Sequence, residues 1–281
     1  MQRSDFLRTG IWLSLYPILS GLRPKASSYS IRLLRHATLI VEMNGVTFMV
    51  DPMLSPKDAM DPIQNAGNDL RIPMSDLPIG QSELREIISQ VDAILLTHTH
   101  RDHWDQAAQD IIDKAKTILC QPSDIDKIKG QGFTQVIGIE DQIDFKKIKV
   151  VRTGGQHGTG DIGKRMGPVS GYVLKQKKQC AYIAGDTIWC DEVKNALNTH
   201  HPETIILNAG GAQFNSGGPI TMTPADITQV REHSPSSKIV AVHMDTVNHC
   251  LIKRKDLRQA ARNHNFEKSL FIPEDGESIK F

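Results

Sequence analysis

From residue 30 onward, apolar positions recur in short runs that are separated by polar turn residues. The first two runs, SIRLLRH (30–36) and TLIVEM (38–43), are followed by Asn44-Gly45 and then by VTFMVDP (46–52). Asn-Gly between two apolar runs is a strong signal for a tight β-hairpin. The folded part of the chain is therefore predicted to begin with antiparallel strands.

Further along the chain, strand-like apolar runs alternate with segments of helical pattern. The expected strands cover 93–96, 117–120, 134–139, 147–153, 169–175, 180–186, 204–210, 238–243 and 277–281. The expected helices cover 82–89, 104–116, 123–132, 190–200, 223–233 and 254–264. In the fifth of these helices, Thr223 is the expected N-cap, with Pro224 at the first helical position.

The order of these elements forms two blocks, each with several strands followed by alternating helices and strands. Two mixed β-sheets packed face to face, with helices outside, satisfy this order, so the predicted fold class is an α/β (αββα) sandwich. A single doubly wound parallel sheet fits the hairpin-rich start poorly. No linker separates the halves, so residues 31–281 are predicted to form one domain. Residues 55–90, which show little periodicity, are predicted to form a lid or insertion that ends in the first helix.

Residues 1–30 form a separate hydrophobic segment. Basic residues precede an apolar run at 11–22, and small residues follow it, which is the order found in signal peptides. The run is too short to span a bilayer and contains Pro17. We favour a helix packed on the domain, on a partner subunit or on a membrane surface. The expected location is therefore cytoplasmic, with export or membrane association through residues 1–28 as the alternative.

Composition narrows the function classes. Lys and Arg number 33 against 32 Asp and Glu, and aromatic residues make up 5% of the chain. Balanced charge and few aromatic residues argue against a nucleic-acid partner. The cysteines, Cys120, Cys180, Cys190 and Cys250, form no C-x-x-C pair and are predicted to be free thiols. The expected partner is a small-molecule or lipid-like substrate. Assembly into a homo-oligomer is a further possibility that the sequence leaves open.

The stretch LLTHTHRDHWD (95–105) gathers three histidines and two aspartates directly after an apolar strand. His98 and His100 are two positions apart on an extended chain, so their side chains point to the same side and can reach one point in space. Asp102 and His103 follow where the chain turns into a helix, which can aim them at a second point. Two metals about 3.5–4 Å apart form a recurrent hydrolytic site.

Three more residues of ligand type stand at the carboxyl ends of apolar runs. His157 lies among glycines in RTGGQHGTG, Asp186 ends CAYIAGD, and His243 ends KIVAVH. Functional sites gather at strand ends in layered α/β folds. Each of these residues alone would be read as an ordinary solvated loop residue. Together with the tight His/Asp run, they favour a metal site.

The run THTHRDH resembles the His-x-His-x-Asp-His signature of the metallo-β-lactamase-fold hydrolases, and the resemblance extends from about Ile31 to the C-terminus. It implies the metallo-β-lactamase fold and two divalent metal ions. By this resemblance, His98, His100 and His157 hold the first metal, Asp102, His103 and His243 hold the second, and Asp186 bridges both. Zinc is the expected metal, and manganese or iron would tolerate the same ligands.

The early segment LLRHATLIVEMNGVTFMVDP is similar to the branch that holds L-ascorbate-6-phosphate lactonase and the N-acyl-phosphatidylethanolamine-hydrolysing phospholipase D. In that branch a histidine precedes the first hairpin and Asp-Pro follows it. His36 and Asp51 match these positions. The similarity implies that Asp51 orients a metal ligand and that His36 lines the site, although Asp-Pro after a strand also makes an ordinary turn.

The expected activity is hydrolysis of an ester, lactone or phosphodiester bond. Metals lower the pKa of bound water toward about 7, so a metal-bridging hydroxide would be available near neutrality. Asp102 is the expected catalytic residue, which would orient this hydroxide or carry a proton. The alternatives are β-lactam hydrolysis, a metal-binding scaffold without catalysis, and a two-iron oxidoreductase, which usually has a carboxylate where His100 stands.

Other polar segments carry less weight. The glycine-rich stretch 208–224 is interpreted as a flexible wall of the pocket or only a connection. Asp105, Thr246 and His249 could orient ligands, but solvated or core roles are favoured for each. His249 is therefore expected to have no contact with metal.

Overall fold

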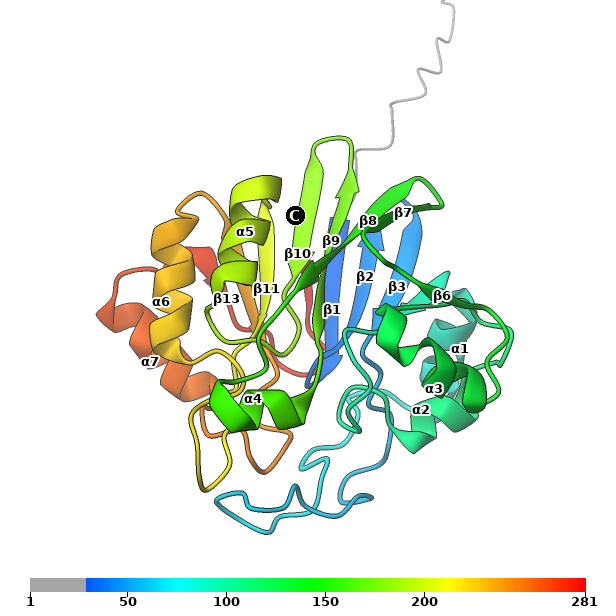
Figure 1. The fold of residues 1–281 in the computed structure, drawn as a ribbon, viewed down its shortest axis with the longest axis horizontal. Coiled ribbons are helices and arrows are strands. Elements are labelled where there is room, and N and C mark those ends of the chain that lie inside the picture. The colour runs from blue at the N-terminus through cyan, green and yellow to red at the C-terminus, as the bar shows by residue number, and fades with distance from the viewer. Residues whose placement is uncertain (1–28) are drawn as a thin grey trace, which may run out of the picture.

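The computed structural model describes residues 29–281, and the prediction for residues 1–28 lies outside this range. Within residues 29–281, no helix combines the length and the apolar character needed to cross a membrane. The chain forms two seven-stranded sheets that face each other, with helices on both outer sides (Figure 1). The predicted αββα sandwich of the metallo-β-lactamase fold is confirmed.

The first sheet is mixed and begins with the predicted hairpins. Asn44 and Gly45 have φ angles of 51° and 81°, the left-handed conformation that a tight hairpin turn requires at both positions. The C-terminal strand pairs with the first strand and so closes one edge of this sheet. In spatial order the strands are β14 (Ser278–Lys280), β1 (Tyr29–Arg35), β2 (Thr38–Met43), β3 (Val46–Val50), β4 (Ala93–Leu95), β5 (Ile118–Cys120) and β6 (Val136–Gly138).

The second sheet repeats this plan, with antiparallel strands at one edge and parallel strands at the other. The three strands over Gln179–Ile183, Thr204–Asn208 and Lys238–Val242 are nearly continuous apolar runs, as expected where both faces of a sheet are covered. In spatial order they are β13 (Leu270–Phe271), β12 (Lys238–Val242), β11 (Thr204–Asn208), β10 (Gln179–Ile183), β9 (Ser170–Gln176), β8 (Ile148–Gly154) and β7 (Gln142–Phe145).

Helices cover the outer faces of both sheets (Figure 1). The first sheet carries α1 (Gln81–Gln90), α2 (Gln106–Ile111) and α3 (Ile125–Gly130), and the second carries α5 (Asp191–His200), α6 (Pro224–His233) and α7 (Arg254–Asn263). One apolar core lies between the sheets, and two further cores lie between each sheet and its helices. Thr223 caps α6 through the reciprocal bonds of a capping box, as its position before Pro224 predicts.

Three local predictions were wrong or incomplete. The helix expected over 104–116 is shorter, because Asp105 caps its start and a turn at Asp113 ends it soon after Ile111. The four-residue strand β7 was not predicted, since only two of its side chains are partly buried. The helix α4 (Gly160–Met166) was also missed, because its two glycines disfavour a helix and none of its residues is buried.

Residues 55–79 form an irregular segment at one end of the sandwich, below the strands in Figure 1, and we call this segment the lid. Arg35, which is fully buried, donates to the carbonyls of Met53, Ser55 and Ser75 at 2.7–2.9 Å. Asp105 accepts a bond from the backbone of Ser55 at 2.7 Å. Both ends of the lid are therefore fixed to the sandwich.

Candidate metal centre

The turn after β4 carries four side chains of the predicted metal site. The backbone N–H groups of His103 and Trp104 both donate to the carbonyl of His100 at 2.9 Å. This tight turn reverses the chain, so the side chains before and after it face a common space. His98, Asp102 and His103 are buried there, and His100 is partly buried.

The first cluster consists of three imidazole rings. Nε2 of His98 lies 2.9 Å from Nδ1 of His100, and the same Nδ1 lies 3.4 Å from Nε2 of His157. His157 comes from the loop after β8, in the second sheet. The three nitrogens lie within 4.8 Å of one another, so they could hold one metal ion.

The second cluster combines a carboxylate with imidazoles. Oδ2 of Asp102 lies 3.7 Å from Nε2 of His103 and 3.7 Å from Nε2 of His243, whose own separation is 3.2 Å. His36 lies behind Asp102, with its Nε2 3.3 Å from the same oxygen. The four residues form a second group that could hold a metal ion. His36 is fully buried and is not among the residues that line the adjoining cavity.

Asp186 lies between the two clusters. Its Oδ2 is 3.2 Å from Nε2 of His103 and 3.6 Å from Nε2 of His157, and its Oδ1 is 3.3 Å from Nε2 of His243. Asn208 donates to Oδ1 at 2.6 Å and holds the carboxylate in this orientation. The structure thus brings together all seven side chains that the sequence suggested as metal ligands.

Asp51 orients two of the rings from behind. It accepts bonds from Nδ1 of His103 at 2.9 Å and from the hydroxyl of Thr97 at 2.6 Å. That hydroxyl in turn accepts from Nδ1 of His98 at 3.0 Å. Both histidines therefore use Nδ1 in this network and turn Nε2 toward the centre. Metal-binding histidines are commonly held in this way by a carboxylate on the far nitrogen.

The other side of the centre shows the same arrangement. Nδ1 of His157 donates to the carbonyl of Ile220 at 2.8 Å, and Nδ1 of His243 lies 3.5 Å from Sγ of Cys250. The inner nitrogens again face the cluster. Imidazole nitrogens and carboxylate oxygens that converge in this manner are the donor set that zinc and related divalent ions take. The residues present therefore fit a metal centre.

Charge in the centre also favours a cation. Burial alone would lower the pKa of His103, but the carboxylates of Asp186 and Asp102 raise it to about 10. Burial lowers the pKa of His36 to about 3, with a contribution from His243. Burial alone would raise the pKa of the Asp102 and Asp186 carboxyls. The neighbouring His103 nevertheless holds both pKa values well below the usual range. Two ionised carboxylates in a buried site require compensating positive charge, which protonated His103 supplies here and which a bound cation would supply in its place.

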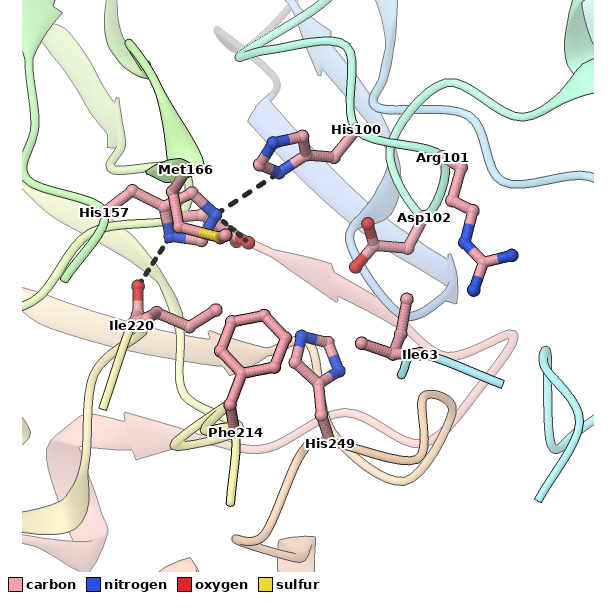
Figure 2. Close-up of a pocket in the computed structure, with 10 residues that line it drawn as sticks. Ile63, His100, Arg101, Asp102, His157, Met166, Phe214, Ile220 and His249 are labelled. Carbon is pink, nitrogen blue, oxygen red and sulfur yellow. Dashed lines mark hydrogen bonds and ion pairs between the residues drawn. The ribbon is translucent and has the colours of Figure 1, made fainter. Parts of the chain in front are cut away.

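A cavity of about 220 Å³ opens next to the ligands (Figure 2). Its far wall is largely apolar and comes from the lid, from α4 and from two loops of the second sheet. The glycine-rich stretch 208–224 contributes to this wall rather than serving only as a connection. The cavity is lined by Ile63, His100, Arg101, Asp102, His157, Met166, Asp186, Phe214, Ile220 and His249.

His249 was missed as a cavity residue. It is 5% exposed, and Figure 2 shows its ring and that of Phe214 across the cavity from His100 and Asp102. Burial lowers the pKa of His249 to about 4, so the ring is neutral at pH 7. It follows the candidate ligand His243 by only six residues, which was the one available signal. Thr246, by contrast, is fully buried and donates to a neighbouring carbonyl, a core role.

A family model for the β-lactamase superfamily domain matches residues 62–244, which include all seven candidate ligands. The chain is also similar to the UPF0173 protein YddR of Bacillus subtilis, with 34% identity over 88% of this chain and 98% of that protein.

Two solved structures share a similar sequence identity with this chain. One is the isothiocyanate hydrolase from Delia radicum gut bacteria, with 35% identity, a TM-score of 0.85, and coverage of 90% of this chain and 99% of that chain. The other is a possible metal-dependent hydrolase from Veillonella parvula, with 35% identity, a TM-score of 0.85, and coverage of 91% and 99%.

Proposed function

Because this chain belongs to the UPF0173 metal-dependent hydrolases of the β-lactamase superfamily, we propose that it is a two-metal enzyme whose seven clustered side chains bind both ions. The observation that carries the proposal is the pair of adjoining clusters with Asp186 within 3.6 Å of both. His98, His100 and His157 would hold one ion, Asp102, His103 and His243 the other, and Asp186 would bridge them. Zinc is the proposed metal, because imidazole and carboxylate donors suit it.

Divalent ions bound here would make hydroxide available near neutral pH, since they lower the pKa of water. The chain itself supplies the remaining functions. Asp102 both belongs to the second cluster and lines the cavity, so its carboxylate can orient the attacking water and accept a proton from it. His36 supports Asp102 from the buried side at 3.3 Å. The apolar far wall limits the amount of competing water.

The cavity favours a small substrate with an apolar body. Its volume of about 220 Å³ is below the ~300–1,000 Å³ that is typical of pockets for drug-sized ligands. Arg101 is the one cationic side chain among the lining residues, and its guanidinium donates to the carbonyls of Asp61 and Pro62. We therefore propose attack at carbon, in an ester or lactone, ahead of attack on a phosphodiester.

Isothiocyanates are a second candidate class, because the similar gut-bacterial structure is an isothiocyanate hydrolase. The balanced reaction is R–N=C=S + H2O → R–NH2 + O=C=S. A new carbon–oxygen bond forms, the carbon–nitrogen bond breaks, and both protons of the water end on nitrogen. The central carbon is an electrophile of the same kind as an ester carbonyl, so the same cavity would serve both reactions.

The test is a substrate screen on protein whose bound metals have been quantified. Phenethyl acetate, phenethyl isothiocyanate, a small lactone, a phosphodiester and a β-lactam would be offered to metal-loaded and metal-stripped protein. We expect turnover of at least one carbon electrophile that is lost on stripping and restored by zinc. Two bound metals without turnover of any of the five would favour a binding scaffold and contradict the proposal. Turnover of the β-lactam alone would contradict the substrate class.

A further inference from the structure

We propose that His249 contacts the substrate directly, donating a hydrogen bond to the heteroatom of the bond that is cleaved. This inference rests on the proposed function. His249 lines the cavity next to the candidate metal centre yet belongs to none of the groups of candidate ligands. It would therefore act on the substrate from the wall that faces the metals.

The first observation is an unpartnered buried nitrogen. His249 is 5% exposed, and its Nδ1 is buried without a hydrogen-bond partner in the structure. Among residues 29–281, it is the only cavity-lining residue that has such an atom. Buried polar atoms are nearly always paired in proteins, so each exception calls for an explanation. Since Nδ1 is buried, the nitrogen that a bound substrate in the cavity can reach is Nε2, which has no hydrogen-bond partner among residues 29–281 either.

The second observation is that the ring is held in place without using its nitrogens. The carbonyl of His249 accepts from the backbone of Gln213 at 3.0 Å, and its ring lies 5.8 Å from that of Phe214. The preceding residue, Asn248, bonds to the lid at Ile63 and Asn68. The imidazole is therefore positioned by its backbone and by apolar contact. Groups held in this way are ready to bind a ligand without first breaking a bond.

The third observation is the chemistry of the ring. A neutral imidazole offers one N–H donor and one acceptor. When hydroxide adds to the carbon of an ester or an isothiocyanate, negative charge develops on the attached heteroatoms. Apart from His249, Arg101 is the cavity residue whose donors are not placed within the metal clusters, and its guanidinium donates to two lid carbonyls. His249 is consequently the side chain best suited to stabilise the leaving oxygen or nitrogen.

Three variants separate hydrogen bonding from packing. His249→Phe keeps an aromatic ring against Phe214 but removes both nitrogens. His249→Asn restores a donor near the place of Nδ1, and His249→Gln restores one near the place of Nε2. His264→Gln is the matched control, because His264 is exposed at the end of α7. Each zinc-loaded variant would be assayed for bound metal, melting temperature, kcat and KM on phenethyl acetate and phenethyl isothiocyanate.

We expect His249→Phe to bind both metals and to lose about 10²–10³-fold in kcat, as the loss of one donor to a developing charge implies. One of the two amide variants should recover most of this loss, which identifies the nitrogen in contact. Unchanged kcat and KM in His249→Phe would overturn the inference, and so would loss of metal in all three variants. If the wild type turns over neither probe, the variants are assayed on whichever other compound of the five-substrate screen it does turn over, and turnover of none of the five means that the proposed function itself has failed.

A measurement on the wild type covers the case in which the variants do not fold. The ring nitrogens of His249 would be observed by ¹⁵N NMR in zinc-loaded protein, before and after addition of phenethylamine or phenethyl alcohol, the products of the two probes. We expect the His249 nitrogen signals to move on saturation with product. Signals that stay in place while other cavity residues respond would overturn the inference.

Discussion

The two walls of the cavity are built differently. The ligand wall consists of side chains at the ends of β4, β8, β10 and β12, and four of its five histidines have the outer nitrogen bonded to a buried partner. The facing wall, which contains Ile63, Met166, Phe214 and His249, comes from the lid, from α4 and from loops. Its side chains are apolar or, in the case of His249, without a partner.

This difference assigns catalysis to the ligand wall and substrate preference to the facing wall. The ligand wall is fixed by the ends of strands from two sheets that enclose a common apolar core, so its geometry changes only if the sandwich changes. The facing wall is joined to the sandwich by a few hydrogen bonds, including those of Asn248 to the lid. Substitutions on the ligand wall should abolish catalysis, whereas substitutions on the facing wall should alter substrate preference with the metals retained.

The largest effect is expected for Asp102→Asn. The substitution preserves size but removes the charge that would balance the metals and accept a proton. Turnover should fall by about 10²–10⁴-fold, the usual contribution of a well-placed acid or base. The fold should survive, because the residue lies in a loop next to the cavity. Turnover, metal content and melting temperature would be compared with those of Asp161→Asn, an exposed carboxylate on α4. Near-wild-type turnover with both metals bound would contradict the assignment.

A smaller effect is expected behind the ligand wall, for Asp51→Asn. Asp51 accepts from both His103 and Thr97, so its loss should weaken metal affinity by about 10–100-fold, as is usual for groups that orient a ligand. Its φ of 44° is tolerated by asparagine, so the backbone should not change. Asp58→Asn is the control, with a φ of 57° at an exposed position. Zinc affinity would be measured by competition with a chelator. Equal affinity in Asp51→Asn and Asp58→Asn would refute the role of Asp51.

On the facing wall, His249 should make the metal-free protein sensitive to acid. Its pKa is lowered from 6.5 to about 4 in the folded state, so folding excludes a proton that the unfolded chain binds below pH 6.5. The stability that this provides is present above pH 6.5 and is lost as pH falls toward 4. Between pH 7 and pH 5, the wild type should lose about 1–2 kcal/mol more unfolding free energy than His249→Gln. Urea titrations at both pH values measure this difference, and parallel losses would show that His249 titrates normally.

The smallest effect is expected for Asn248→Ala. The variant loses the side-chain bonds to Ile63 and Asn68 and so loosens the lid without touching a candidate ligand. KM should rise about threefold to tenfold at nearly constant kcat, because a bond worth about 1 kcal/mol acts on binding rather than on the reacting atoms. Asn195→Ala, at an exposed position on α5, is the control. A fall in kcat at unchanged KM would show that the lid acts on the chemistry instead.

The same contrast explains what the sequence could predict. The two sheets and most helices follow from apolar periodicity and from signals such as Asn44-Gly45, and the ligands follow from the tight spacing of His98 to His103 and from strand ends. The facing wall has no comparable signal. His249 resembles any buried or solvated histidine until the lid and Phe214 are placed beside it, and α4 has neither a buried face nor good helix formers. Contacts between distant irregular segments, such as that of Ile63 with Asn248, produce no periodic pattern in the sequence from which they could be predicted.

The central claim is that seven side chains, spread from His98 to His243, hold two metal ions side by side. The most direct measurement is an anomalous difference map recorded at the zinc edge from crystals of the zinc-loaded protein. The account predicts two peaks about 3.5–4 Å apart, one among His98, His100 and His157, the other among Asp102, His103 and His243, with Asp186 between them. A single peak after full zinc loading, or two peaks that Asp186 does not bridge, would contradict it.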